Sequence, residues 1–502
     1  MSKPALTLSL ILVLATGGVS QTNYGTGTPG PGGVVPRLTS GQAWMGNTAF
    51  SLDMAGAPGG AAGWLVVSFA PAAVTSGSTP IWVDFNQVNS VTPVAFSGSG
   101  GAPGQGAGSV PAPLNFGVLP YLAGLSFYAQ AFIPYSGGVA VSAGLEITLT
   151  MPPEILVSSC CGSQYVIDPQ AQTLAVPPSP VPANGIYDAI SDEGGRYVYL
   201  SADGAGGGIF RGDASLQPPA YTPLGPPRRT FFLRLDEERQ RLWAIADNGS
   251  GDRDLVVFDV DPASSTFGNQ IDAIPAIGNV AERFALSGDG NRAVVQSGFG
   301  TTLVVYDTDP ASPTYKQILS TIAVPTNPQA VIAFVLDLAF AHDGDTLLVP
   351  LNYIVAPGMP ISCEIARYSL SANAFIDHDS NTPLIDNIGP SASPPVTFEA
   401  VISRVIPSRY SDRVALSGLG VTPWAGTLDL SPTLPAGYAW TPVQGVSMSG
   451  PYTAVLDPEG KTLAVPDTSG GGSLYLFDAA SGVLLNTVAL PGGNFLYSVI
   501  WR

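Results

Sequence analysis

The chain has 502 residues, and its 37 acidic and 19 basic side chains give a formal net charge of −18 and a pI near 4.3. Because no basic patch compensates this charge, it argues against binding to nucleic acid or to an anionic membrane. Charged residues make up only 11% of the sequence, whereas 59 Gly and 47 Pro indicate many turns and 45% hydrophobic residues supply a core.

The first 20 residues have the three-part layout of a secretory signal peptide. Lys3 precedes an apolar run over residues 6–15, and small residues end at Ser20, after which we expect cleavage. The alternative, a membrane anchor, needs about 20 apolar residues, and this run is shorter. We therefore expect an exported protein that is secreted, periplasmic or held at the cell surface, with no transmembrane segment.

Residues 22–152 have the pattern of a β-sandwich accessory domain. Alternating apolar runs, such as WLVVSFA (64–70) and LEITLTM (145–151), lie between stretches rich in Gly, Pro and Ser. The four charged side chains in this region are Arg37, Asp53, Asp84 and Glu146. Residues 151–154, Met-Pro-Pro-Glu, then serve as a linker to the second domain.

From residue 155 to the end, the chain repeats a unit of four short strands. The clearest copy covers residues 452–491, in which a turn at 457–460 joins the first two apolar runs. Six units can be followed, and a seventh first strand, 495–502, ends the chain without partners. Its missing strands lie at 155–176, so both ends of this region would complete one shared blade. The sequence predicts an all-β fold, a β-sandwich followed by a seven-bladed β-propeller over 155–502, as a monomer.

Two resemblances agree with this division. Residues 155–502 resemble lactonase-like propellers of the YVTN type, through FALSGDGNRAVVQS (284–297), VLDPEGKTLAVPDTS (455–469) and LYLFDAASG (474–482). These motifs consist of turn and packing residues, so the resemblance implies a fold that enzymes and binding proteins share. The segments YGTGTPGPGG (24–33) and LAGLSFYAQAFI (122–133) resemble a small β-domain of secreted proteins from planctomycete-type bacteria.

Propeller topology predicts which face of the ring binds a ligand. The loops between second and third strands and between blades are the long ones, for example 352–362 and 326–331, and both classes return to the face where the first strands begin. Five charged residues enter the first strands there, near the mouth of the channel: Asp188, Glu282, Arg283, Asp337 and Glu399. They form either a ligand or ion site, with paired carboxylates as acid and base, or solvated loop charges and ion pairs between strands.

Two further sets of residues are candidates for chemical sites. Asp247, Asp252 and Asp254 lie in one Gly-rich loop, and oxygen ligands from such a loop suit Ca²⁺, although the spacing is not that of an EF-hand and an ordinary turn is the alternative. His342 and His378 are the only histidines, and both fall in turns on the face opposite the long loops. A His-based triad or zinc site at the channel is therefore not expected.

The three cysteines complete the set of reactive residues. Cys363 lies in a blade roughly across the ring from Cys160 and Cys161, so a disulfide between them would exceed the reach of about 7 Å between Cα atoms. We expect Cys363 to be a packed thiol, and we leave open whether Cys160 and Cys161 bridge.

The sequence is consistent with two functions. The first is a secreted or surface protein that binds a small molecule, glycan or protein partner through the long-loop face of the propeller. The alternative is a lactonase-like hydrolase acting on a small sugar lactone with carboxylates at the channel. Neither identifies the ligand or substrate.

Overall fold

The computed structural model describes residues 21–502 except 42, 48–49, 115–121, 123, 151–153, 160–162, 170–172, 182–184, 193–194, 203–206, 214–218, 280, 282, 297–300, 325–330, 355–360, 377–399, 409–410, 421–422, 432–438, 449, 459, 468–471, 492–495 and 502. The expected signal segment lies outside these residues. The chain divides into two compact units, Met1–Pro152 (unit 1) and Pro153–Arg502 (unit 2). Among the described residues, no helix has the length and apolar character needed to cross a membrane.

Unit 1 is a β-sandwich, as predicted. Its larger sheet has the order β1-β11-β9-β4-β7, with β10 added beside β9, and its smaller sheet has the order β2-β3-β8. The strands of the larger sheet are β1 (Gln21–Tyr24), β4 (Ala62–Ser68), β7 (Val88–Ala95), β9 (Ser126–Tyr135), β10 (Gly138–Val141) and β11 (Gly144–Thr148). The others are β2 (Arg37–Ser40), β3 (Ser51–Ala57), β8 (Gly106–Pro111) and the hairpin β5 (Pro71–Ser76) with β6 (Thr79–Val83). One core contains Leu52 of β3, Leu65 of β4 and Ala131 of β9, so both sheets contribute to it.

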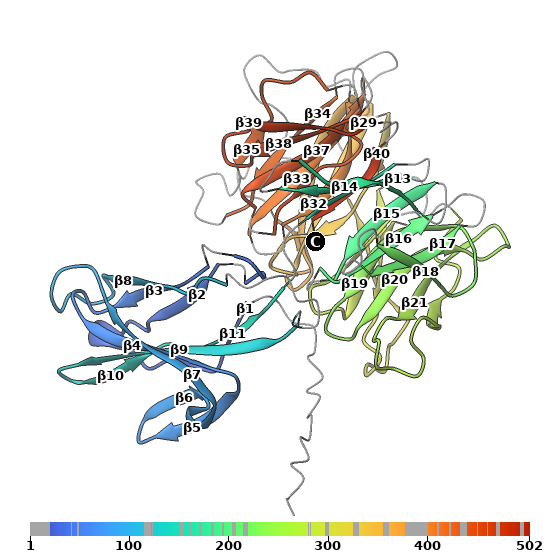
Figure 1. Cartoon of the computed structure of the whole chain (residues 1–502). Coiled ribbons are helices and arrows are strands. Elements are labelled where there is room, and N and C mark those ends of the chain that lie inside the picture. The colour runs from blue at the N-terminus through green and yellow to red at the C-terminus, as the bar shows by residue number, and fades with distance from the viewer. Residues whose placement is uncertain are drawn as a thin grey trace, which may run out of the picture. The chain divides into compact units, whose positions relative to one another are not determined.

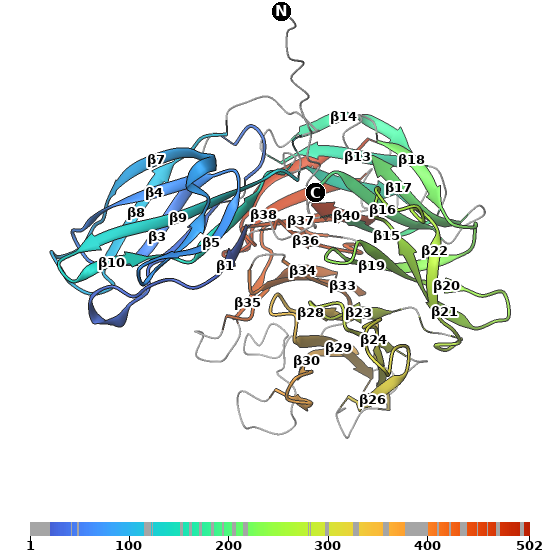
Figure 2. The same ribbon diagram turned by 90° about the horizontal axis from the view of Figure 1, so that it is seen from below.

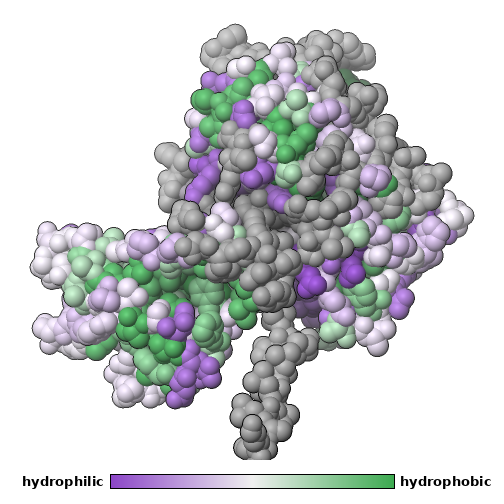
Figure 3. All heavy atoms as spheres, viewed as in Figure 1, coloured by the Kyte–Doolittle hydropathy of each residue, from purple (hydrophilic) through white to green (hydrophobic). Residues whose placement is uncertain are grey.

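The face of the larger sheet away from this core also carries apolar side chains. In register, Trp64 of β4 lies opposite Phe132 of β9 and opposite Pro93 of β7. Trp64 is 49% exposed and Phe85, whose ring centroid is 6.0 Å from that of Phe132, is 54% exposed. Figure 3 shows hydrophobic residues gathered on the side of unit 1 that faces the viewer. The scarcity of charge in residues 22–152 thus leaves apolar surface as well as an apolar core.

Unit 2 is a seven-bladed β-propeller. Within its described residues there are seven antiparallel sheets, each built from strands that follow one another in sequence, apart from the sheet that joins the two ends (Figure 1). The innermost strands of blades 1 to 6 are β15 (Ile186–Ser191), β19 (Thr230–Asp236), β23 (Phe284–Leu286), the pair β27 (Ile332–Val335) and β28 (Ala339–Phe340), β32 (Ala400–Pro407) and β36 (Val455–Leu456). Figure 2 shows β15, β19, β23 and β36 nearer the middle of unit 2 than the outer strands β18, β22, β26 and β35.

The remaining strands extend each blade outward. Those of blades 1 to 3 are β16 (Tyr197–Ala202), β17 (Gly208–Asp213), β18 (Ala220–Leu224), β20 (Arg241–Asp247), β21 (Arg253–Asp259), β22 (Gln270–Ile274), β24 (Arg292–Gln296), β25 (Thr302–Asp307) and β26 (Ile318–Ala323). Those of blades 4 to 6 are β29 (Thr346–Ile354), β30 (Ile361–Ser369), β31 (Ala374–Phe375), β33 (Arg413–Gly420), β34 (Trp424–Asp429), β35 (Ala439–Pro442), β37 (Thr462–Asp467), β38 (Ser473–Asp478) and β39 (Leu484–Ala489).

The closing blade joins both ends of the propeller sequence, as predicted. It has the order β14-β13-β12-β40, with β12 (Ile155–Ser159), β13 (Ser163–Asp168), β14 (Thr173–Pro180) and β40 (Leu496–Trp501). In the antiparallel pair of β12 and β40, Leu156 lies opposite Ile500 and Val157 opposite Val499. This pairing satisfies the edge of the last strand, so the ring has no open sheet edge at the point where it closes.

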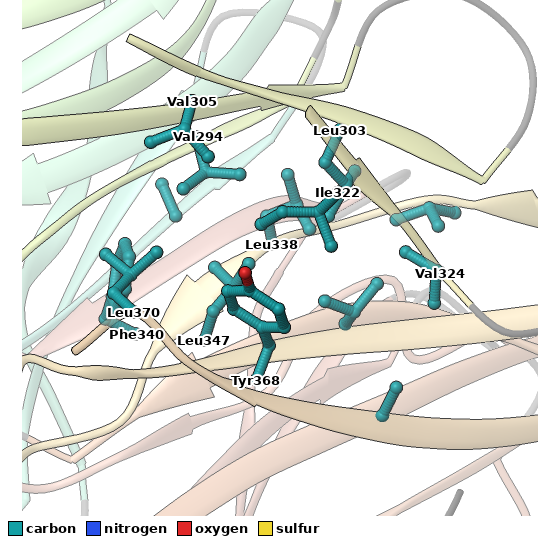
Figure 4. Packing of buried hydrophobic residues seen from close by; sticks show 14 of the residues in the cluster. Val294, Leu303, Val305, Ile322, Val324, Leu338, Phe340, Leu347, Tyr368 and Leu370 are labelled. Atoms are coloured by element: carbon teal, nitrogen blue, oxygen red, sulfur yellow. The ribbon is translucent and has the colours of Figure 1, made fainter. Parts of the chain in front are cut away.

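Burial explains why the strands differ in pattern across a blade. The second strand β20 is a continuous apolar run, with only its two end residues partly exposed, because neighbouring blades cover both of its faces. The outer strand β26 is instead mostly exposed, and Ile322 is its one buried residue. Figure 4 shows the core between blades 3 and 4, where Val294 and Val305 of one blade lie near Phe340 and Leu347 of the next.

The turn between first and second strands repeats closely in four blades. In blade 6, Asp457 N donates to Thr462 O and Gly460 N donates to Asp457 O, at 2.9 Å each. Equivalent pairs begin at Asp192 in blade 1, at Ser287 in blade 3 and at Ala341 in blade 4. Gly460 has φ +71°, a conformation that favours glycine, so the recurring Gly in these turns is a backbone requirement. These turns fix the end of the ring toward which the first strands run.

Candidate functional site

The innermost strands are irregular where charged residues approach the centre of the ring. Register shifts occur between Ile186 and Asp188 in β15 and between Ile402 and Arg404 in β32. In blade 4, Asp337 lies in the break that separates β27 from β28. A bulge leaves a backbone amide without its partner in the ladder and turns nearby side chains in a new direction. These irregularities bring the charged side chains to the centre of the ring.

Asp188 joins three blades. Its Oδ2 accepts a hydrogen bond from Leu233 N of blade 2 at 3.0 Å, and its Oδ1 accepts one from Arg404 Nη2 of blade 5 at 2.8 Å. Arg234 Nη1 lies 3.7 Å from Oδ2. Asp188 is only 6% exposed, so each of these contacts is made away from bulk water.

Asp337 has the same role in blade 4. Its Oδ1 accepts from Leu338 N and its Oδ2 accepts from Val405 N of blade 5, both at 2.9 Å. Arg234 Nη2 lies 3.8 Å from Oδ1, and Asp337 is 1% exposed. Both carboxylates thus bind a backbone amide in the following blade and are neutralised by arginine.

Three arginines surround the ring of Phe232. The guanidinium carbons of Arg283, Arg404 and Arg234 lie 3.8, 4.3 and 5.9 Å from its centroid. Arg283 Nη1 donates to the Tyr187 hydroxyl at 3.2 Å, and its Nε donates to Leu336 O. We call Asp188, Asp337, Arg234, Arg283 and Arg404, with Phe232, the channel cluster.

The pKa values of the two arginines that pair with the carboxylates shift in opposite directions. Burial lowers the pKa of Arg234, although Asp337 and Asp188 oppose this effect. Burial alone would also lower the pKa of Arg404, but Asp188 and Asp337 outweigh it and raise that pKa. Both side chains stay protonated at neutral pH, because an arginine pKa starts far above it. Arg234 and Arg404 are therefore permanently charged groups within the channel cluster.

A recurring polar position in the second strands supports the cluster. Asn352 of blade 4 accepts from Ile402 N of blade 5 at 2.7 Å, and Gln296 of blade 3 donates to Val335 O of blade 4 at 2.8 Å. Ser201 and Ser417 occupy comparable places and donate to Phe231 O and Tyr452 O in the following blades. These side chains satisfy the irregular backbone of the next innermost strand.

A cavity of about 280 Å³ lies on the axis of the ring beside the channel cluster. Asp188, Arg234, Asp337 and Arg404 supply its polar end. Most of its other walls are apolar: Ala189, Ile190, Leu233, Ala285, Leu286, Ala339, Phe340, Val405, Ile406, Pro407, Val455, Leu456, Pro458, Val499, Ile500 and Trp501. These residues come from the later halves of the innermost strands and from a tight turn. The cavity therefore lies toward the end opposite the long loops.

The five residues predicted at the channel mouth have different outcomes. Asp188, Arg283 and Asp337 lie together in the channel cluster, whereas Glu282 and Glu399 lie outside the described residues. The prediction missed Arg234 and Arg404, which are central to the cluster. Alternation along a regular strand gave no reason to turn Arg404 inward, since its position depends on the register shift just before it.

The face predicted for binding is only partly described. Residues 325–330 and 355–360, which supply the two long loops named in the sequence analysis, lie outside the described residues. The long-loop face thus stays a prediction, while the cavity on the axis lies toward the other end.

The acidic loop 247–254 is arranged around arginine and amide groups. Asp247 lies 3.6 Å from Arg229 Nη1 and 3.5 Å from Arg253 Nε. Asp254 Oδ1 accepts from Asn248 Nδ2 and from Ala276 N at 3.0 Å each. Within the part of the chain that the structure describes, no three His, Cys, Asp or Glu side chains come together in a way that could hold a metal ion. Calcium binding by Asp247, Asp252 and Asp254 stays a prediction.

The remaining reactive residues are structural where they are described. His342 is exposed in the turn between β28 and β29, as predicted, and His378 lies outside the described residues. Cys363 in β30 is a buried thiol that packs with Ile365 and Ile402, which confirms that prediction. Cys160 and Cys161 lie outside the described residues.

Comparison with known proteins shows that this chain is similar in fold to several solved structures. No protein-family model and no curated protein sequence matches this chain. A protein of Bacteroides uniformis provisionally named a 6-phosphogluconolactonase is 10% identical, with 70% of this chain and 99% of that one covered and a TM-score of 0.47. The Cps50 (Swd1) propeller domain of Myceliophteria thermophila is 12% identical, with 65% and 93% covered and a TM-score of 0.43.

Hydrazine synthase of Kuenenia stuttgartiensis is also similar, at 14% identity, with 59% of this chain and 77% of that one covered and a TM-score of 0.41. At such identities a likeness concerns the fold alone. The propeller itself is established by the strand pairing of this chain.

Proposed function

We propose that this chain is an exported binding protein and that its propeller is a rigid holder rather than an enzyme. The observation that carries the proposal is that Asp188 and Asp337 bind protein groups of neighbouring blades. Each accepts a backbone N–H from the following blade and is neutralised by arginine while more than nine-tenths buried. Carboxylates held in this way connect blades.

A lactonase would need different carboxylates. A general acid or base must reach the substrate within hydrogen-bond distance and exchange a proton near neutral pH. Asp337 already uses both carboxylate oxygens to accept the Leu338 and Val405 amides, and it pairs with Arg234. Neither oxygen can accept from a substrate without giving up one of these contacts, which opposes a catalytic role for this residue.

Turnover of sugar lactones is the direct test. We expect the purified mature chain to hydrolyse glucono-δ-lactone and its 6-phosphate no faster than buffer does. Glu282→Ala and Asp337→Asn serve as the variants, and circular dichroism checks that each still folds. Turnover by the wild type that either folded variant abolishes would overturn the proposal and establish a hydrolase.

Export is a separate part of the proposal with its own measurement. It is supported by the signal-like layout of residues 1–20. Expression in a bacterial host with the native leader, followed by intact mass and N-terminal sequencing, should give a chain that starts at Gln21 outside the cytoplasm. A cytoplasmic product that retains residues 1–20 would contradict export.

A further inference from the structure

We propose that the cavity on the propeller axis binds a small monocarboxylate with an apolar body, whose carboxylate lies against Arg404. This inference deepens the proposed binding function and rests on it. The observations that carry it are a polar end and apolar walls in one cavity, and a buried guanidinium whose donors are not all used.

Arg404 has more donors than the described protein residues accept. It is 5% exposed, and among the described residues its hydrogen-bond acceptor is Asp188 Oδ1, which receives Nη2. The buried Nε of Arg404 has no acceptor there. An unsatisfied buried donor costs roughly 1–3 kcal/mol, and more in a charged group, so an acceptor is expected at this place.

The neighbouring Arg234 has more acceptors than Arg404 has. Arg234 donates from Nη1 to Leu233 O at 2.7 Å and from Nη2 to Leu338 O at 3.0 Å, besides its two carboxylate partners. Arg404, which lines the polar end of the cavity, therefore has fewer acceptors among the described residues than Arg234 has. Trp501, another lining residue, has a buried indole N–H without an acceptor among the residues described.

A carboxylate fits these donors better than other acceptors do. It accepts two parallel hydrogen bonds from a guanidinium, and a bond between two charged groups is roughly twice as strong as a neutral one. Ammonium and other cations have no acceptor to offer Arg404. A hydroxyl is uncharged and offers a single oxygen, so it cannot meet two parallel guanidinium donors with two separate acceptors.

The walls and volume define the rest of the ligand. Ile190, Leu286, Phe340, Ile406 and Val499 line the cavity with hydrocarbon. Its volume of about 280 Å³ is nearly twice the roughly 150 Å³ of a dry cavity that admits benzene. An aliphatic chain of about six to ten carbons, or one substituted aromatic ring, would fill it.

Binding of octanoate to the mature chain tests the proposal, with 1-octanol and octylamine as isosteric controls. By calorimetry we expect octanoate to bind with one site per chain and to raise the melting temperature, octanol to bind at least about tenfold more weakly, and octylamine to show no binding. Octanol that binds as tightly as octanoate, or octanoate that does not bind, would overturn the inference.

Variants locate the site. Arg404→Gln should weaken octanoate binding at least about tenfold and leave octanol binding unchanged, since only the charge-assisted bond is lost. Arg413→Gln is the matched control, because Arg413 pairs with Asp429 at 3.3 Å and does not line the cavity. If Arg404→Gln does not fold, Ala189→Phe keeps the charges and fills the cavity, and it should abolish binding. Unchanged octanoate affinity in either folded variant would contradict the site.

The two proposals fail separately. Absence of octanoate binding in a chain that also leaves lactones intact would remove this inference and leave the proposed function in place. Lactone turnover that is lost in folded Asp337→Asn would remove the proposed function whatever octanoate does.

Discussion

The channel cluster and the 247–254 loop use the same residue types in opposite ways. Asp337 is 1% exposed and accepts two backbone amides, one of them from another blade. The side chain of Asp247 is 31% exposed. Its partner Arg253 belongs to the same blade, and its partner Arg229 directly precedes the first strand of that blade. The comparison teaches that a structural carboxylate in this ring is recognised by its contacts with another blade, and not by its lying among other acidic residues.

Removal of β40 should have the largest effect, and it should affect the channel cluster rather than the 247–254 loop. Deleting 495–502 takes away the partner of β12 and three cavity-lining residues, Val499, Ile500 and Trp501, so the channel cluster loses the closed ring that holds it. The 247–254 loop depends only on blade 2. We expect an aggregating product, seen by size-exclusion chromatography, because the edge of β12 becomes exposed. A soluble truncation with an unchanged thermal midpoint would show that closure is dispensable.

Replacing a single carboxylate should next lower the free energy of unfolding by different amounts in the two regions. Asp337→Ala leaves Arg234 without one of its partners and two amides without an acceptor, so we expect a loss of about 3–5 kcal/mol in the free energy of unfolding. Asp252→Ala, the control in the loop, should change it by no more than about 0.5 kcal/mol. Urea denaturation followed by tryptophan fluorescence measures both. Equal losses in the two variants would remove the distinction.

Acid should remove the stabilising contribution of Asp272, a carboxylate outside the channel. Asp272 accepts from Tyr315 Oη at 2.6 Å and pairs with Lys316. Burial alone would raise its pKa, but hydrogen bonds from Lys316, Tyr315 and its neighbour Ala273 outweigh this and lower the pKa below its ordinary 3.8. Its contribution is therefore complete above about pH 4 and is lost as pH falls through the lower folded value.

The Asp272→Asn variant isolates that contribution. We expect it to be about 0.5–1 kcal/mol less stable than the wild type at pH 6, with the difference shrinking below pH 4, because the exposed pair is a weak one. Denaturation midpoints from pH 2 to pH 6 provide the measurement. A difference that grows toward low pH would have the wrong sign and would refute this assignment.

Calcium gives the smallest expected effect and tests the loop itself. If Asp247, Asp252 and Asp254 bind Ca²⁺, millimolar calcium should raise the melting temperature by mass action, and Asp252→Ala should abolish the rise. A scan with magnesium controls for ionic strength. No calcium-dependent shift would leave the loop as a turn held by the ion pairs of Asp247.

The blade architecture could be predicted from the sequence because it depends on local patterns. Apolar runs, tight turns with glycine and the incomplete unit at each end identified seven blades and the closing pair of β12 and β40. Unit 1 was likewise predicted from alternation and scarce charge. Each of these features is visible within a few residues of the chain.

The channel cluster could be predicted only in part. Asp188, Arg283 and Asp337 were found because they enter first strands, but which groups they contact depends on register shifts that follow no local pattern. Arg404 and Arg234 were not predicted, because neither lies at the start of a first strand. One signal was available: Ser201, Gln296, Asn352 and Ser417 interrupt otherwise apolar second strands, and each contacts the following blade.

A double-mutant cycle on Asp188 and Arg404 tests the central claim that the channel charges connect blades. Their side chains are 2.8 Å apart, 9% and 6% exposed, and belong to blades 1 and 5. We expect each of Asp188→Ala and Arg404→Ala to lower the free energy of unfolding by about 3 kcal/mol, with a coupling energy of about 1.5–3 kcal/mol in the cycle. Single losses below about 1 kcal/mol with a coupling energy near zero would contradict the account, because these charges would then be free for another role.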